Sequence, residues 1–223
     1  MLLKNPYIYY NKAISESDCD RIIKIGMSKL QPAQTIDGKD SHNDEMKTAA
    51  NDMTKEDLDK LGIKETAYMR DSQVAWLSDK WIYDKVLPFI NDANKKAGWN
   101  WKHDYIEQIQ FTKYGLNQFY GWHADGNSDF LSVYKGKPNP SMNGKVRKIS
   151  VTINLVSGDE YEGGNLRFDY GPHAGKNRYK VCEEIRPKGS IIVFPSILYH
   201  QVTPITKGTR YSLVMWVLGR PWQ

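Results

Sequence analysis

The sequence predicts an α+β protein that is mainly β, with helices in its first part and strands in its second. Residues 1–100 contain stretches whose apolar residues recur at helical spacing. After Gly98 the apolar period changes to two, and short alternating runs separated by turn residues follow. Many short strands with regular turn signals are typical of a β-sandwich or a β-barrel. We therefore expect one domain, in which a helical layer with loops over residues 1–100 supports a barrel-like β-structure over residues 101–223.

The composition is that of a protein with one apolar core and a charged surface. The chain has 223 residues, of which 40% are hydrophobic and 26% are charged. No apolar run approaches the ~20 residues needed to cross a bilayer, and the polar N-terminal stretch does not resemble a signal peptide. Cys19 and Cys182 lie far apart and form no metal-binding pair. We expect a reducing, cytoplasmic setting and no membrane partner.

The net charge of +5 leaves nucleic acid open as a partner. The basic residues are scattered, however, and no run of five or more Lys or Arg occurs. The densest group is KVRK at residues 145–148. A mildly basic surface is therefore the favoured interpretation, and nucleic-acid binding is not expected.

Helices are expected in the first part of the chain from capping residues and periodic apolar residues. The segment 15–30 offers two capping-type starts, at Ser15 and at Ser17, and continues with a helical apolar stripe. A longer helix is expected over residues 78–98, with Ser78 as its N-cap and a kink at Pro88. A short helix is expected at residues 54–62 and a loop at residues 31–51.

Strands are expected throughout the second part because apolar and polar residues alternate there. The expected strand segments are 105–115, 118–125, 147–156, 163–170, 178–187, 189–195, 198–205 and 209–219.

A group of potential metal ligands lies in two of these segments. His123 and Asp125 are two residues apart, so their side chains share a face of an extended segment. His200 on a later strand is the candidate third ligand. Two imidazoles and one carboxylate match the facial triad of non-haem Fe(II) oxygenases. The same three groups could hold zinc with a bound water, and His123 with Asp125 alone could be a salt-bridged pair.

The other histidines have weaker contexts as ligands. They lie in a polar loop, before the first strand of the second part, and in a turn, and we expect them to be solvated or to have core partners. They are His42, His103 and His173.

Arg210 lies ten residues beyond His200 on an expected strand. An inward arginine is costly unless an anion meets it, and its planar guanidinium suits a carboxylate. We expect Arg210 to bind the far carboxylate of a dicarboxylate co-substrate whose other end reaches the metal.

Four segments of the chain resemble the 2-oxoglutarate- and Fe(II)-dependent dioxygenases. They are RDSQVAWL, YGLNQFYGWHADG, GGNLRF and GSIIVFPSILYHQVTPITKGTRYSLVMW. The resemblance extends over about residues 68–220, and the prolyl 4-hydroxylase-like branch with its small bacterial and phage members is nearest. It implies a double-stranded β-helix core, the jelly roll of cupin-like proteins. It also implies an enzyme that consumes 2-oxoglutarate and O₂, releases succinate and CO₂, hydroxylates a C–H bond and uses ascorbate as reductant.

The resemblance also implies roles for single residues. The positions that match the iron ligands are His123, Asp125 and His200. Arg210 matches the residue that binds the distal carboxylate of 2-oxoglutarate, and Tyr114 matches a tyrosine that helps to bind it. A core tyrosine with a satisfied hydroxyl is the alternative for Tyr114. Thr152 is a further candidate for the same carboxylate, and Ser212 completes the RxS pattern without an assigned contact.

The same resemblance favours a proline-containing peptide or protein as substrate. Other amino-acid side chains and small metabolites are alternatives, as is a non-catalytic metal-binding jelly roll. Nucleic-acid demethylases of the superfamily carry a second arginine where this chain has Trp216, so this alternative is disfavoured. The Gly/Asn/Ser/Pro-rich segment 126–146 is expected to be a substrate lid, with a mobile surface loop as the alternative. The oligomeric state is not predicted.

Overall fold

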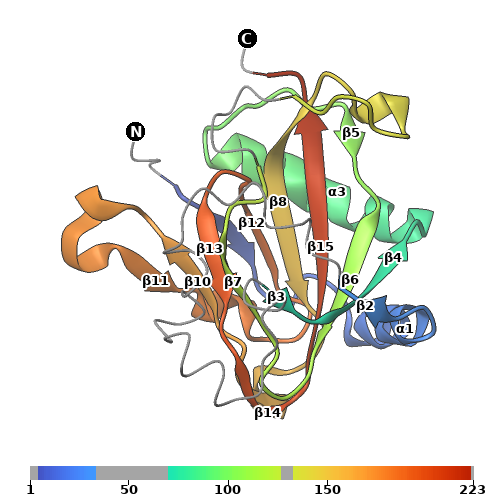
Figure 1. Ribbon diagram of the computed structural model, residues 1–223, viewed down its shortest axis with the longest axis vertical. Helices are drawn as coiled ribbons and strands as arrows, with labels where there is room; N and C mark the ends of the chain where they lie inside the picture. Colours follow the sequence, from blue (N-terminus) through green and yellow to red (C-terminus); the bar gives the residue numbers. More distant parts are fainter. Residues whose placement is uncertain (1–4, 34–69, 127–132, 222–223) are drawn as a thin grey trace.

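The computed structural model describes residues 5–33, 70–126 and 133–221 (Figure 1). Its first and larger sheet contains β1 (Ile8–Tyr10), β2 (Gln31–Pro32), β4 (Gln73–Leu77), β5 (Tyr105–Ile106), β6 (Ile109–Tyr114), β8 (Val146–Asn154), β12 (Ile191–Pro195) and β15 (Arg210–Gly219). The second sheet contains β3 (Arg70–Asp71), β7 (Phe119–His123), β10 (Leu166–Asp169), β11 (Tyr179–Val181) and β13 (Tyr199–Val202). A two-stranded sheet contains β9 (Tyr161–Gly163) and β14 (Ile205–Gly208).

The strands pair antiparallel and cross between distant parts of the sequence. The first sheet has the order β1-β12-β8-β15-β6-β4-β2, with β5 also paired to β15. The second has the order β11-β10-β13-β7-β3. Short 3₁₀ turns connect several strands, namely η3 (Pro140–Met142), η4 (Gly158–Glu160), η5 (Pro172–Asn177) and η6 (Glu183–Ile185). This mainly β architecture confirms the predicted fold class.

Two helices of the described residues cover the outer face of the first sheet, and α3 runs behind β8 and β15 (Figure 1). Helix α1 (Glu16–Met27) begins as predicted, because the hydroxyl of the N-cap Ser15 accepts a hydrogen bond from the backbone N–H of Asp18 at 3.2 Å. Helix α3 (Lys80–Lys96) runs through Pro88 as one element. Its N-cap is Asp79, so the predicted cap Ser78 is wrong. The hydroxyl of Ser78 instead accepts a hydrogen bond from the side chain of Gln108 at 3.2 Å.

The apolar core between the helices and the first sheet determines which face of that sheet is left for a site. Alternate residues of β8 enter this core, namely Ile149, Val151 and Ile153. The residues between them, Ser150 and Thr152, point to the opposite face, toward the second sheet. A smaller apolar cluster between the sheets includes Leu166, Phe168, Ile192 and Phe194. The two sheets therefore enclose a mixed polar and apolar interior.

The first part of the chain contributes strands as well as helices, which the sequence pattern did not indicate. Strands β1, β2 and β4 extend the first sheet, and β3 closes the second sheet against β7. They are only two to five residues long, so alternation cannot be recognised in them. The expected strand 105–115 is divided into β5 and β6, and the expected strand 178–187 contains β11 followed by η6.

Other expectations from the sequence concern segments only partly within the described residues. The expected helix at 54–62 and residues 34–51 of the expected loop lie outside them, as do residues 127–132 of the expected lid. Cys19 and Cys182 are both buried and free. Neither helix in the described ranges combines the length and the apolarity that crossing a bilayer requires.

Gly26 tests the contact between α1 and the first sheet. A methyl group at this position would overlap the ring of Phe111 on β6. We expect Gly26→Ala to lower the free energy of unfolding by about 1–3 kcal/mol, because overpacking outweighs the helix propensity that alanine gains. Urea denaturation measures this change. Lys24→Ala on the exposed side of the same helix should change stability by less than about 0.5 kcal/mol. A Gly26→Ala effect of that small size would contradict the contact.

Candidate metal centre

Strand pairing brings the first and last predicted metal ligands together. Strands β7 and β13 are neighbours, with His200 opposite His123 and Val202 opposite Tyr120. The two pairs are three residues apart on β7 but only two residues apart on β13. Strand β7 therefore contains one extra residue between Tyr120 and His123, which is a β-bulge. The extra residue lets Tyr120 and His123 face the same side although they are three residues apart, and their rings stack at 3.6 Å. The bulge thus directs His123 into the space between the sheets.

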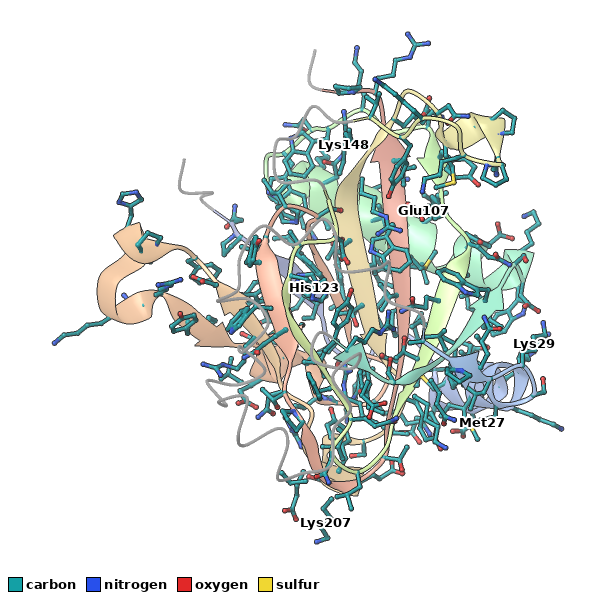
Figure 2. The ribbon with its side chains drawn as sticks, viewed as in Figure 1. Met27, Lys29, Glu107, His123, Lys148 and Lys207 are labelled. Carbon is teal, nitrogen blue, oxygen red and sulfur yellow. The ribbon has the colours of Figure 1, made fainter. Side chains whose placement is uncertain are left out.

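The three predicted ligands converge on one point. The Nε2 atom of His123 lies 3.6 Å from Asp125 Oδ1, and the Nε2 atom of His200 lies 3.6 Å from Asp125 Oδ2. One ligand atom from each residue lies within 4.8 Å of the others. Figure 2 shows His123 near the middle of the molecule, between the two sheets. This is the arrangement expected from a facial triad.

Backbone carbonyls hold both imidazoles in the tautomer that a metal requires. The Nδ1 atom of His123 lies 2.8 Å from the carbonyl of Gly121, and that of His200 lies 2.9 Å from the carbonyl of Leu198. Because a carbonyl only accepts, each Nδ1 carries the proton and each Nε2 keeps its lone pair for a metal. Burial and the nearby His123 lower the pKa of His200 to about 4, so its ring is neutral at neutral pH.

A chain of hydroxyl groups orients the carboxylate of Asp125. The hydroxyl of Ser150 donates to Asp125 Oδ2 at 2.6 Å, and it lies 2.9 Å from the hydroxyl of Ser196. Burial alone would raise the pKa of Asp125, but the imidazoles and the Arg147 guanidinium outweigh it and hold that pKa well below its usual range. Asp125 is therefore an ionised and oriented carboxylate, as a metal ligand requires.

Arg147 on β8 connects the main chain at Asp125 to the first sheet. It donates from Nη1 to the backbone carbonyl of Asp125 at 3.3 Å. Its Nε and Nη2 atoms donate to the carboxylate of Glu107 at 2.6 and 2.7 Å. The guanidinium lies over the ring of Trp216 at 3.9 Å. These contacts fix the position of the main chain at Asp125.

The predicted co-substrate residues line the same cavity as the three ligands. Tyr114, Thr152, Arg210 and Ser212 are all in its wall. Arg210 on β15 is 1% exposed and lies opposite Tyr114 on β6, with its guanidinium 5.6 Å from the tyrosine ring. The Nε atom of Arg210 is buried without a hydrogen-bond partner, and the guanidinium takes part in no ion pair of the described residues. An anionic ligand of the cavity would satisfy it.

The remaining histidines do not join the cavity within the described residues. His103 lies 3.2 Å from the side chain of Asn91, and His173 lies in η5. His42 is outside the described residues.

Several residues of the site were not found from the sequence, among them Tyr120, Ser150, Arg147 and Glu107. A signal existed for Ser150, because a serine that alternates with isoleucine and valine in a strand marks a polar position on the second face. Arg147 and Glu107 are 40 residues apart, and no spacing rule connects them.

The donor set of the site fits a divalent transition metal. It has two neutral imidazole nitrogens and one carboxylate oxygen, and the cavity wall continues from them to Arg210. Three protein ligands on one side leave room for other ligands from the cavity, which suits Fe(II).

Comparison with known sequences finds relatives for the part of the chain that holds the site. Residues 109–218 match the family model described as the 2OG-Fe(II) oxygenase superfamily. A PKHD-type hydroxylase of Xylella fastidiosa (strain 9a5c) is 36% identical over 110 residues, which cover 48% of this chain and 43% of that protein. A PKHD-type hydroxylase of Stenotrophomonas maltophilia (strain R551-3) is also 36% identical over 110 residues, covering 48% and 41%. The chain spans less than half the length of these curated relatives.

Comparison with solved structures finds the same fold over nearly the whole chain. The viral collagen prolyl hydroxylase of Paramecium Bursaria Chlorella virus-1, solved as a 2OG complex, has a TM-score of 0.60 at 15% identity, covering 98% of this chain and 99% of that one. A prolyl-4-hydroxylase of Pseudomonas putida has a TM-score of 0.57 at 16% identity, covering 100% and 96%. A prolyl hydroxylase from Trichoplax adhaerens, in complex with a hypoxia inducible factor oxygen degradation domain peptide fragment, has a TM-score of 0.55 at 14% identity, covering 97% and 84%. The predicted jelly-roll core is confirmed.

The hydroxyl chain generates a prediction about metal affinity. Ser150→Ala removes the donor to Asp125, and we expect the affinity for Mn(II) or Co(II) to fall about 10–100-fold. Isothermal titration calorimetry measures it, with His123→Ala as the variant that should lose binding. Ser190→Ala is the matched control, because this buried serine contacts Asn11 and Lys12 instead. Equal affinities of Ser150→Ala and the unmodified protein would contradict the assigned role.

Proposed function

We propose that this chain, which belongs to the 2OG-Fe(II) oxygenase superfamily, is a 2-oxoglutarate-dependent Fe(II) dioxygenase that hydroxylates prolyl residues of a peptide or protein. The observation that carries the proposal is the convergence of His123, Asp125 and His200 in one cavity with the buried Arg210, whose Nε has no hydrogen-bond partner among the described residues. An ion-pair network that served stability alone would not bring three ligand atoms together beside a buried arginine that forms no ion pair within the described part of the chain.

The ligand residues define what the metal would do. The two Nε2 atoms and the Asp125 carboxylate would hold Fe(II), which when bound supplies the activation of O₂ together with 2-oxoglutarate. One oxygen atom of O₂ enters the substrate C–H bond and the other enters succinate, while 2-oxoglutarate loses CO₂. Ascorbate would serve as the reductant that keeps the iron divalent.

The far part of the cavity would orient 2-oxoglutarate. Arg210 would bind its distal carboxylate, and the hydroxyls of Tyr114 and Thr152 are the candidates for further hydrogen bonds to it. Apolar residues of the wall, namely Leu166, Phe194, Val202 and Val214, would exclude water from the reacting groups.

The choice of prolyl substrates is supported by the names of the relatives and of the similar structures. A protein or peptide partner is also supported by the peptide bound in the Trichoplax adhaerens structure. A cytoplasmic location is part of the proposal, because two buried free thiols fit a reducing compartment. If the following tests fail, the alternatives are a different substrate or a jelly roll without catalytic activity. The alternative substrates are another amino-acid side chain, a small metabolite or nucleic acid.

Activity on peptides tests the proposal directly. Purified protein with Fe(II), 2-oxoglutarate, ascorbate and air should add the mass of one oxygen atom to proline-rich peptides, in step with the succinate formed. Mass spectrometry measures both products. His200→Ala should lose both, and exclusion of air should stop the reaction. Succinate formation without peptide oxidation across varied sequences would reject the substrate, and turnover without O₂ would reject the reaction.

Arg210→Gln tests the assignment of the co-substrate. Loss of a bidentate, charge-assisted hydrogen bond to the distal carboxylate should raise the KM for 2-oxoglutarate about 100-fold, which corresponds to about 3 kcal/mol of binding free energy. Steady-state kinetics at varied 2-oxoglutarate measures this. Arg210→Lys should raise KM less, because the charge remains. Arg21→Gln on the exposed surface of α1 is the control and should leave KM unchanged. An unchanged KM in Arg210→Gln would place the co-substrate elsewhere.

A further inference from the structure

The last two residues of the basic group KVRK serve two different cavities. Adjacent residues of β15 pair with Ile149 and Arg147 of β8, so Lys148 between them is one extra residue in β8, which is a β-bulge. Arg147 contacts the main chain of Asp125 at the candidate metal centre. Lys148 instead lines a second cavity, and Figure 2 labels it toward the upper end of β8.

This second cavity, which we call the Lys148 cavity, lies where α3 and β15 end. It is lined by residues 99–104, by Lys148 and by residues 219–221, and its volume is about 400 Å³. Among the described residues it shares no lining residue with the cavity of the candidate metal centre. Sites for small molecules commonly have volumes of about 300–1,000 Å³. The Lys148 cavity is therefore large enough to hold a ligand of its own.

Positive charge predominates in the wall of this cavity. Its cationic members are Lys102, Lys148 and Arg220. Asp104 supplies one carboxylate, which is already paired with Lys145 at 2.8 Å. Burial lowers the pKa of His103, so this histidine adds no charge at neutral pH. The wall therefore suits a ligand with a negatively charged group.

Lys148 is the cation that is most enclosed. It is 5% exposed, which is unusual for a lysine. Its Nζ atom donates to the backbone carbonyl of Lys102 at 3.1 Å. Burial lowers the pKa of Lys148, and the carboxylate of Asp104 opposes this only in part. An anion in the cavity would stabilise the ammonium group further, because opposite charges attract more strongly where water is excluded.

Two tryptophans form another part of the wall. The rings of Trp99 and Trp101 stack at 5.3 Å with an angle of 15° between them. The Nε1 atom of Trp99 donates to the backbone carbonyl of Asn5 at 3.3 Å, so this ring presents carbon atoms rather than a donor to a ligand. Indole rings pack against other flat rings by stacking or edge contacts. A ligand that carries both a flat ring and a negative charge would use both parts of the wall.

We propose that the Lys148 cavity binds a small anion in which a phosphate or carboxylate group is attached to a flat ring. Lys148, Lys102 and Arg220 bind the acidic group. The indoles of Trp99 and Trp101 contact the ring. The site goes beyond the proposed function and does not depend on it, because its ligand is neither 2-oxoglutarate nor the molecule that is hydroxylated.

Four probes test the chemistry of the site. AMP combines a ring with a phosphate and benzoate combines a ring with a carboxylate, whereas adenosine and inorganic phosphate each lack one part. The protein is first loaded with Mn(II) and 2-oxoglutarate, free Mn(II) is removed, and isothermal titration calorimetry measures each affinity. The tighter of AMP and benzoate should bind at least about tenfold more tightly than adenosine and inorganic phosphate, and it identifies the acidic group. Its affinity should be the same in protein without Mn(II) and 2-oxoglutarate.

Variants locate the bound probe. Lys148→Met keeps a long side chain without its charge and should weaken binding of the tighter probe at least about tenfold. The double variant Lys102→Gln, Arg220→Gln changes two exposed residues and should weaken it about tenfold, even if Lys148→Met does not fold. Lys80→Gln removes the same charge from the exposed surface of α3 and is the control, with unchanged affinity expected. Thermal unfolding checks that each variant is folded.

Three results would overturn the site. The first is equal binding of the four probes, or of inorganic phosphate and the tighter ring compound. The second is an unchanged affinity in folded Lys148→Met or in the double variant. The third is displacement of the tighter probe by 2-oxoglutarate, which would place it at the metal centre. A protein that binds the probe as expected but hydroxylates no peptide would support the site and count only against the proposed function.

Discussion

The pairing of β7 with β13 is the constraint on which the candidate metal centre depends. It sets His123 opposite His200. The bulge between Tyr120 and His123 turns the side chains of Tyr120 and His123 toward the space between the sheets. The bulge also aims the carbonyl of Gly121 at the imidazole of His123. One extra residue in β7 therefore determines both the direction of the His123 side chain and the tautomer of its ring. Asp125 follows directly and completes the group.

The two faces of the first sheet differ in what they contact: the outer face packs on the helices, and the inner face lines the cavity. The outer face packs on α1 and α3 through buried apolar residues, which gives the sheet a rigid support. The inner face can then carry groups that are costly to bury, such as Ser150, Thr152 and Arg210. Ser150 is satisfied by Asp125, whereas Arg210 keeps an unpartnered Nε. The satisfied groups orient the candidate metal ligands, and the unsatisfied group is where we propose that an anion binds.

The same distinction extends to the outer part of the site. Arg147 donates two hydrogen bonds to the carboxylate of Glu107 and a third to the main-chain carbonyl of Asp125, so this ion pair supports the candidate metal centre (Figure 2 labels Glu107 beside the upper part of β15). In the part of the chain that the structure describes, Trp216 Nε1 and Arg70 Nη2 are buried without an acceptor, and the exposed ring of Trp76 lies beside Trp216.

The sequence by itself determined the elements whose signals are local. The two-residue spacing of His123 and Asp125, the cap at Ser15 and the alternation in β8 each follow from neighbours along the chain, and the structure agrees with them. His200 and Arg210 were candidates from their residue types and strand positions, the resemblance to a known family matched both, and the structure places them in the same cavity as His123 and Asp125. Ser78 failed as a cap because its hydroxyl is held by Gln108, 30 residues away.

What only the tertiary structure decided is which distant residues meet. The bulge that directs His123, the strands contributed by the first part of the chain, and the contact of Arg147 with Glu107 all depend on register between strands. Trp76 lies beside Gln110 of the cavity wall only because β4 pairs with β6 there. Local spacing specifies the face on which a side chain lies. Its partners are specified by strand order and register, which result from burial of the whole core.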